Sequence, residues 1–136
     1  MTLRNLAGFA MGAMFLVAGS ASAHHSFSAE FDAEKPIKLT GIVTKVEWTN
    51  PHVWFYINVK DEATGEVTNW GAEMGPPHGL QRRGWRRDTL KIGEEVTVDG
   101  FLARNGSHRV NARSVTLTAT GTRPGETLDA NSSSGQ

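Results

Sequence analysis

Apolar and polar side chains alternate along most of the chain between residues 37 and 117, as in strands that have one buried face. The clearest run is residues 53–59, where Val53, Phe55 and Ile57 are separated by polar or aromatic side chains. Because successive side chains of a strand point to opposite faces, we predict that these three fill a core. Similar runs predict further strands over residues 37–48, 66–74, 95–103 and 108–117.

The first predicted strand changes its phase of alternation. Apolar residues fall at positions 37 and 39, and then at positions 42, 46 and 48. We place the change at Thr40–Gly41, because glycine tolerates the bulge or bend that a change of phase requires. A long strand bent at this point can serve both sides of a small closed barrel.

The breaks between the runs predict the order of the elements. Asn50–Pro51, residues 61–65 and Asn105–Gly106 are typical of turns. Between the third and fourth strands, residues 80–85 allow one or two helical turns that end at Gly84. Three strands, a short helix and two strands is the order of the oligonucleotide/oligosaccharide-binding (OB) barrel. We therefore predict an all-β fold, a five-stranded OB-like barrel with a short helix between strands 3 and 4. An open meander or a small sandwich is the alternative.

The two ends of the chain differ in composition from the predicted barrel. Residues 1–23 combine Arg4, an apolar run and the small residues Ala21-Ser22-Ala23, which is typical of a secretory signal peptide. The apolar run is short for a membrane span, which needs about 20 residues, although an uncleaved anchor is the alternative. We expect cleavage between Ala23 and His24, a periplasmic or secreted protein, and no membrane span after cleavage.

The remaining chain divides into three predicted parts. Residues 24–36 form a polar N-terminal arm, in which Phe27 and Phe31 fit either a helical turn or a segment laid over the barrel. The barrel domain covers residues 37–118. Residues 119–136 are rich in Gly, Ser, Thr and Asn, and we predict a disordered tail.

Composition excludes several function classes. The chain has no cysteine, so disulfides and thiol chemistry are excluded. Its 14 Lys and Arg balance 14 Asp and Glu, which argues against general nucleic-acid binding because that relies on an excess of positive charge. No serine has an evident base beside it in the sequence. We therefore expect a protein that is not an enzyme and has no catalytic residues.

The first candidate site is a metal site at the new N-terminus. Cleavage would give His24 a free amine, and the amine and imidazole of one residue can chelate one ion. His25 follows directly, and His52 lies at the predicted turn. Nitrogen ligands of this kind favour copper, followed by nickel and zinc. The alternative is a solvated His–His pair at a frayed terminus.

The second candidate site is aromatic. Trp54 and Tyr56 have the opposite parity to the predicted core, so we expect them outside the barrel together with His52 and Trp70. In an OB barrel this face of strands 2 and 3 binds ligands. The alternative is that the arm or the short helix covers the face, which would make the aromatic residues part of the core.

The third candidate site is basic and is interrupted by Gly84–Trp85. Arginine forks bind phosphate and carboxylate well, so the segment is a candidate for an anion or an acidic partner. A solvated network of surface ion pairs with nearby acids is the alternative. The four residues are Arg82, Arg83, Arg86 and Arg87.

Several short motifs resemble those of a family of small exported bacterial proteins that contain a domain of unknown function. The motifs are His24–Phe27, Glu30–Asp32, Leu39–Gly41, Trp48–His52, Gly84–Trp85 and Ile92–Val96. The resemblance covers about residues 24–118 and implies an exported, OB-like barrel without an assigned activity. By topology the chain also resembles, more distantly, the periplasmic OB-fold stress proteins of bacteria.

We therefore predict an exported, non-enzymatic binding module for a small ligand or a protein partner. The first alternative is a copper-binding protein that uses His24, His25 and His52. The second is an accessory subunit that docks on an exported enzyme through the aromatic face or the arginines.

Overall fold

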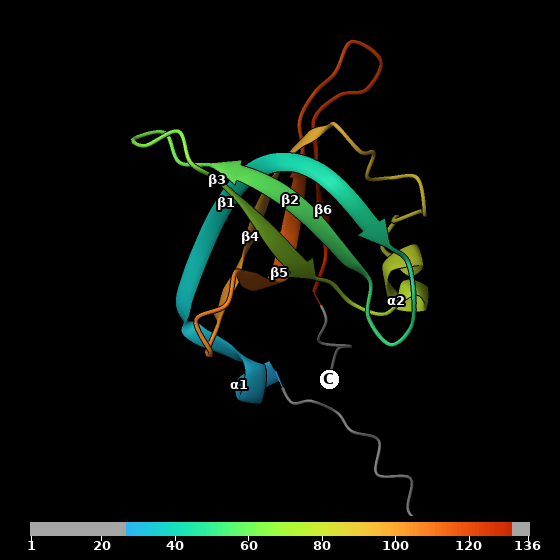
Figure 1. Ribbon diagram of the computed structural model, residues 1–136. Helices are drawn as coiled ribbons and strands as arrows, with labels where there is room; N and C mark the ends of the chain where they lie inside the picture. The colour runs from blue at the N-terminus through green and yellow to red at the C-terminus, as the bar shows by residue number, and fades with distance from the viewer. Residues whose placement is uncertain (1–26, 132–136) are drawn as a thin grey trace, which may run out of the picture.

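The computed structural model describes residues 27–131, and every helix and strand below lies in that range. A helical turn leads into a long first strand, and a second short helix lies between the third and fourth strands (Figure 1). The elements are α1 (Phe27–Glu30), β1 (Phe31–Glu47), β2 (Trp54–Lys60), β3 (Val67–Glu73), α2 (Pro77–Arg82), β4 (Glu95–Ala103), β5 (Arg109–Leu117) and β6 (Glu126–Asp129).

The strands close into a ring around one core. β1 pairs antiparallel with β4 along its first part and with β2 along its last part. β2 pairs with β3, and β4 pairs with β5. A parallel contact between β3 and β5 closes the ring. The predicted all-β, barrel-like fold with a short helix between strands 3 and 4 is confirmed, but the sheet within residues 27–131 has six strands and not the five that we predicted. The finer likeness to the OB fold stays a prediction. In the described part of the chain, neither helix is long and apolar enough to cross a membrane.

The barrel interior is built from the alternating positions. Val53, Phe55 and Ile57 are fully buried, as predicted from their parity. The helix side of the core contains Leu80 and Trp85, which are also buried. Burying a large apolar side chain contributes about 1.5–3 kcal/mol, so these positions supply much of the driving force for folding.

The change of phase in β1 lies later than we predicted. Gly41 faces inward in regular register, and the irregularity falls between Val43 and Lys45. A Cβ atom at Gly41 would lie 2.5 Å from the backbone oxygen of Asn58, so only glycine fits this inward position. Ile42 consequently points outward and is 40% exposed. Because Gly41 has no side chain, the sequence showed no apolar residue at this inward position. We therefore placed the change of phase too early in the strand.

The arm and the barrel meet earlier than we predicted. β1 begins at Phe31 and continues through Pro36, which pairs with Phe101 after an irregularity in the register. Phe27 stacks on Phe31 with ring centroids 6.0 Å apart, and meets Phe101 edge-on at 5.6 Å. The arm residues from Phe27 onward therefore pack against β4. Residues 24–26 lie outside the described part of the chain.

The predicted disordered tail is wrong for residues 119–131. β6 pairs with the second half of β5, and Leu128 and Ala130 are buried. The indole Nε1 of Trp85 donates to the carbonyl oxygen of Asp129 at 2.7 Å. The glycines and proline at residues 121–125 form only the loop, while the two apolar residues behind it complete the core. Residues 132–136 lie outside the described range.

Candidate functional site

The outer face of β2 and β3 carries two half-buried aromatic rings. Trp54 and Tyr56 point outward because the residues between and around them point into the core. Both rings lie over Gly71 of β3. A Cβ atom at Gly71 would lie 3.3 Å from Tyr56 Cε1 and 3.6 Å from Trp54 Cζ3. The glycine therefore allows the two rings to lie close to the sheet.

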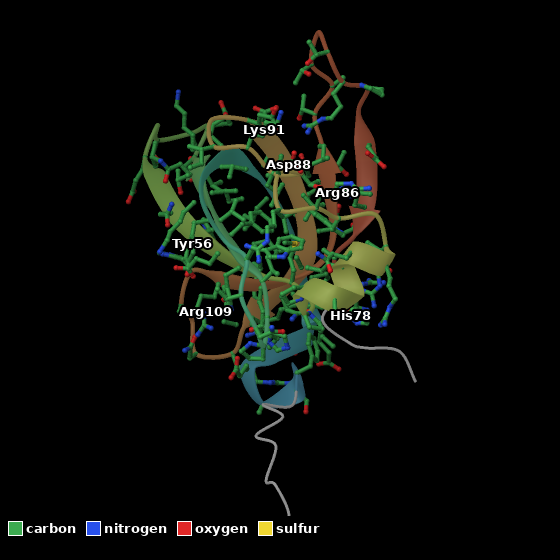
Figure 2. The ribbon with its side chains drawn as sticks, turned by 90° about the vertical axis from the view of Figure 1, so that its right-hand side faces the viewer. Tyr56, His78, Arg86, Asp88, Lys91 and Arg109 are labelled. Atoms are coloured by element: carbon green, nitrogen blue, oxygen red, sulfur yellow. The ribbon has the colours of Figure 1, made fainter. Side chains whose placement is uncertain are left out.

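The parallel pairing of β5 with β3 brings an arginine to the same face. Arg109 is the register partner of Gly71, and its guanidinium carbon lies 4.6 Å from the centre of the Trp54 ring. Figure 2 shows Tyr56 and Arg109 on one side of the molecule, with His78 and Arg86 on the other. A hollow of about 330 Å³ lies beside Trp54, Tyr56 and Arg109. We call it the aromatic groove, and its lining is Glu47, Trp54, Tyr56, Asn69, Gly71, His108 and Arg109.

The acidic group of the aromatic groove is neutralised within the protein. Glu47 accepts a hydrogen bond from the Tyr56 hydroxyl at 3.2 Å and pairs with Lys45 at 2.5 Å. The bond from Lys45 holds the pKa of Glu47 below its usual value. Burial, with Glu47 nearby, raises the pKa of Tyr56, so its hydroxyl stays protonated as the donor.

A second polar cluster lies beside the aromatic groove on the same strands. Glu73 is only 7% exposed, and its Oε1 lies 3.3 Å from His52 Nδ1. Asn111 of β5 also donates to this oxygen through Nδ2, at 3.3 Å. Burial lowers the pKa of His52, and the charge of Glu30 partly opposes the shift. His52 is therefore neutral near pH 7, which is the form of imidazole that binds metal ions.

The metal prediction is only partly within the described structure. His52 is placed beside Glu73, whereas His24 and His25 lie outside the described residues. Among residues 27–131, no group of three or more His, Asp or Glu side chains converges to hold a metal ion. The copper site at His24, His25 and His52 stays a prediction.

The prediction for Trp70 is wrong. Trp70 is the register partner of Ile57, so it lies on the inner side of β3 and packs against the core. Its ring lies 4.9 Å from that of His108, which lines the aromatic groove, but Trp70 itself is not part of the lining. The parity that Trp70 shares with Ala72 was the available signal, because Ala72 is a natural core residue and is fully buried.

The four arginines of the basic segment do not form one site. Arg82 donates to His78 Nδ1 at 3.0 Å, within the turns of α2. Arg83 donates to the carbonyl oxygen of Asn131 at 2.8 Å, so it ties α2 to the chain after β6. Arg86 and Arg87 are exposed and flank a hollow beside the buried Trp85. The docking role of this segment stays a prediction.

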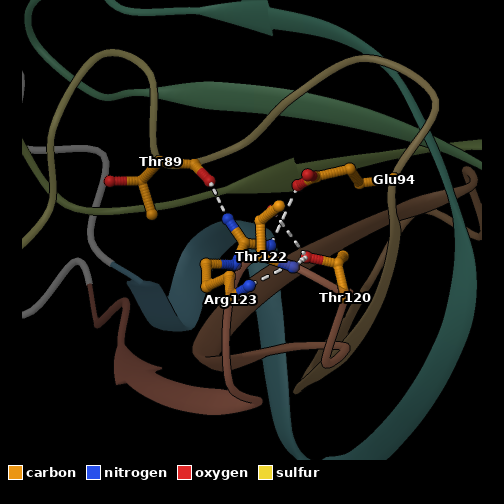
Figure 3. A network of polar contacts seen from close by, with 5 residues as sticks. All are labelled: Thr89, Glu94, Thr120, Thr122 and Arg123. Atoms are coloured by element: carbon orange, nitrogen blue, oxygen red, sulfur yellow. Dashed lines mark hydrogen bonds and ion pairs between the residues drawn. The ribbon is translucent and has the colours of Figure 1, made fainter.

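Two acids that are near these arginines in the sequence, Glu73 and Glu94, have other partners. Glu73 is with His52, and Glu94 pairs with Arg123 at 2.9 Å. Figure 3 shows Arg123 among Thr89, Glu94, Thr120 and Thr122, where it joins the loop before β6 to the segment before β4. Arg123 had no role in our sequence interpretation, because we assigned its segment to the tail.

The sequence interpretation also missed Arg109 and Glu47 as neighbours of the aromatic residues. Glu47 was predictable, because it ends the strand that pairs with β2. Arg109 was not, because only the long-range contact between β3 and β5 brings it to Trp54. The available hint was its place at the start of the strand after the Asn105–Gly106 turn.

The chain belongs to DUF6152, a family of unknown function, which it matches over residues 13–112. The predicted resemblance to a family of unknown function is thereby confirmed. No curated protein matches the chain significantly. The likeness to periplasmic OB-fold stress proteins stays a prediction.

Proposed function

We propose that this member of a family of unknown function is an exported, non-enzymatic binding module, and that the aromatic groove takes a small ligand with a flat ring. The observation that carries the proposal is the pair of half-buried rings, Trp54 and Tyr56, laid over Gly71 on the outer face of the barrel. Aromatic side chains at such a surface stack on sugars and planar groups.

The segments that, in the alternative interpretation, would cover this face are engaged elsewhere. Phe27 and Phe31 pack against each other and against Phe101 of β4. Leu80 and Trp85 belong to the core. The volume of about 330 Å³ is at the small end of the range for ligand pockets, which is about 300–1,000 Å³. A single sugar or a substituted benzene fits that size.

An NMR titration tests the proposal. Glucose, galacturonate, benzoate and benzamide are added separately to ¹⁵N-labelled protein, and shifts are followed at the Trp54 indole N–H. We expect at least one ring compound to shift that signal with saturation. Trp54→Ala should weaken binding by about tenfold, since stacking contributes about 1–3 kcal/mol, whereas Trp54→Phe should retain most of it. If none of the four compounds binds, or if Trp54→Ala binds as the wild type does, the groove has no such role.

A second candidate function is copper binding, supported by the placement of His52. A carboxylate at Nδ1 holds an imidazole in one orientation and leaves Nε2 for a metal, an arrangement that is common in histidine metal sites. Glu73 stands at that position, 3.3 Å from His52 Nδ1. His24 and His25 would supply the other ligands.

Isothermal titration with Cu(II) tests this candidate. Protein that begins at His24 should bind tightly, and one extra residue before His24 should weaken binding strongly by blocking the amine. His52→Gln should also weaken binding. Equal affinity of the free and the extended N-terminus would rule out the amine as a ligand.

A further inference from the structure

Arg109 differs from the other half-buried arginines of the described chain. Arg83 donates to Asn131, and Arg123 donates to Thr89 and Glu94. Within residues 27–131, the Arg109 side chain donates no hydrogen bond and has no carboxylate within 4.0 Å. Its nitrogen atoms are not among the buried polar atoms that lack a partner, so they are open to solvent and to a ligand.

The geometry of Arg109 leaves its donors available. Its guanidinium carbon lies over the Trp54 ring, 4.6 Å from the ring centre. The N–H groups point outward in the plane of the group, so stacking on an aromatic ring and forked hydrogen bonding to a carboxylate use different parts of it. Stacking also fixes the orientation of the fork, which lowers the entropy cost of binding.

Arg109 also carries a positive charge in the aromatic groove, and no carboxylate of residues 27–131 pairs with it. The acid of the groove, Glu47, already has Lys45 and the Tyr56 hydroxyl as partners. Asn69 is bonded to Thr44 and Asn58. The remaining polar side chains of the lining are His108 and Arg109, and Arg109 places a positive charge beside the Trp54 ring.

We infer that the ligand of the aromatic groove is a ring that carries a carboxylate. The ring packs against Tyr56 and Trp54, and the carboxylate is held by the Arg109 fork. This inference rests on the proposed function and adds the charge of the ligand to it. Two sources share this chemistry, namely uronic acids from acidic polysaccharides and small aromatic acids.

The experiment compares each acid with a neutral counterpart of the same shape. Galacturonate is paired with its methyl ester, and benzoate with benzamide, in the NMR titration described above. We expect the acid of at least one pair to bind about tenfold more tightly, as a charge-assisted forked bond provides. The pair in which the acid binds more tightly shows whether the ligand is a uronic acid or an aromatic acid.

Substitutions assign the difference to Arg109. Arg109→Gln should remove the preference for the acid while the neutral ring still binds, and Arg109→Lys should retain only part of it because a lysine cannot fork. Arg113→Gln is the matched control. Arg113 also stacks on an aromatic ring, that of Phe101 at 5.4 Å, but it lies outside the aromatic groove. It should leave the preference unchanged.

The outcomes separate the inference from the proposed function. Equal binding of acid and neutral ring by the wild type overturns the inference and leaves the binding module in place. An unchanged preference in Arg109→Gln also overturns it. Failure of all the rings to bind removes the proposed function and the inference together. Amide spectra of each variant check that it is folded. The comparison of acid and neutral ring with the wild-type protein does not depend on any variant.

Discussion

Arg123 and Arg109 are both half-buried, but their surroundings differ. Arg123 donates to Thr89 and Glu94, and its backbone N–H donates to Thr120 Oγ1, so it holds two loops together (Figure 3). The guanidinium carbon of Arg109 lies 4.6 Å from the centre of the Trp54 ring, and within residues 27–131 its side chain donates no hydrogen bond. The first arrangement is what stability requires of a buried cation, and the second is what recognition of an outside anion requires.

The same contrast holds for the tryptophans on the two sides of the barrel. Trp85 is 1% exposed, and its indole N–H is bonded to the carbonyl of Asp129. Trp54 is half-buried and rests on Gly71. We therefore expect substitutions near α2 and β6 to change stability, and substitutions in the aromatic groove to change binding.

The largest expected effect is at Trp85. Trp85→Ala should lower the free energy of unfolding by about 3–5 kcal/mol, because it leaves a cavity and an unpaired carbonyl at Asp129. Trp54→Ala, as the matched variant, should cost about 1 kcal/mol or less. Urea denaturation measures both. Comparable losses at the two positions would contradict the division into a structural side and a binding side. If Trp85→Ala does not fold, Trp85→Phe serves in its place, with a smaller loss.

A matched pair of arginine substitutions gives the next effect. Arg123→Met should cost about 1–3 kcal/mol, because Glu94 and the carbonyl of Thr89 lose their donor. Arg109→Met should change stability by no more than about 0.5 kcal/mol. The measurement is again the midpoint and slope of urea denaturation. A larger loss at Arg109 would mean that its stacking on Trp54 is structural.

The pH dependence at His52 is a smaller effect. Burial places the pKa of folded His52 below its usual 6.5, so the unfolded chain takes up this proton first as the pH falls. The stability that neutral His52 contributes is therefore complete above pH 6.5 and is lost as the pH falls toward the folded pKa. We expect wild-type stability to fall relative to His52→Gln as the pH falls below about 6.5 in metal-free buffer. A constant difference would show that the folded pKa of His52 is not lowered.

The smallest expected effect is at Arg86 and Arg87. Both side chains are exposed, so Arg86→Gln with Arg87→Gln should change stability by less than about 0.5 kcal/mol. Thermal unfolding measures this change. The double variant should also leave binding at the aromatic groove unchanged. A loss of binding there would mean that the two sides of the barrel are coupled.

The sequence by itself determined the local features. The period of two assigned Val53, Phe55 and Ile57 to the core, and the turn residues Asn105–Gly106 marked a hairpin, since both signals depend only on near neighbours. The same alternation also predicted the face of β2 on which Trp54 and Tyr56 lie. The order of the first five strands followed from these signals, whereas β6 did not.

Only the tertiary structure decided what lies against those side chains. The register of β3 placed Trp70 inside, the backbone of Asn58 required Gly41, and the parallel pairing with β5 brought Arg109 to Trp54. Leu128 and Ala130 became core because they complete the barrel beside β5. Alternation assigns a side chain to one face of its own strand, but register and closure depend on residues that are distant in sequence. For that reason the aromatic pair was predictable, and its arginine was not.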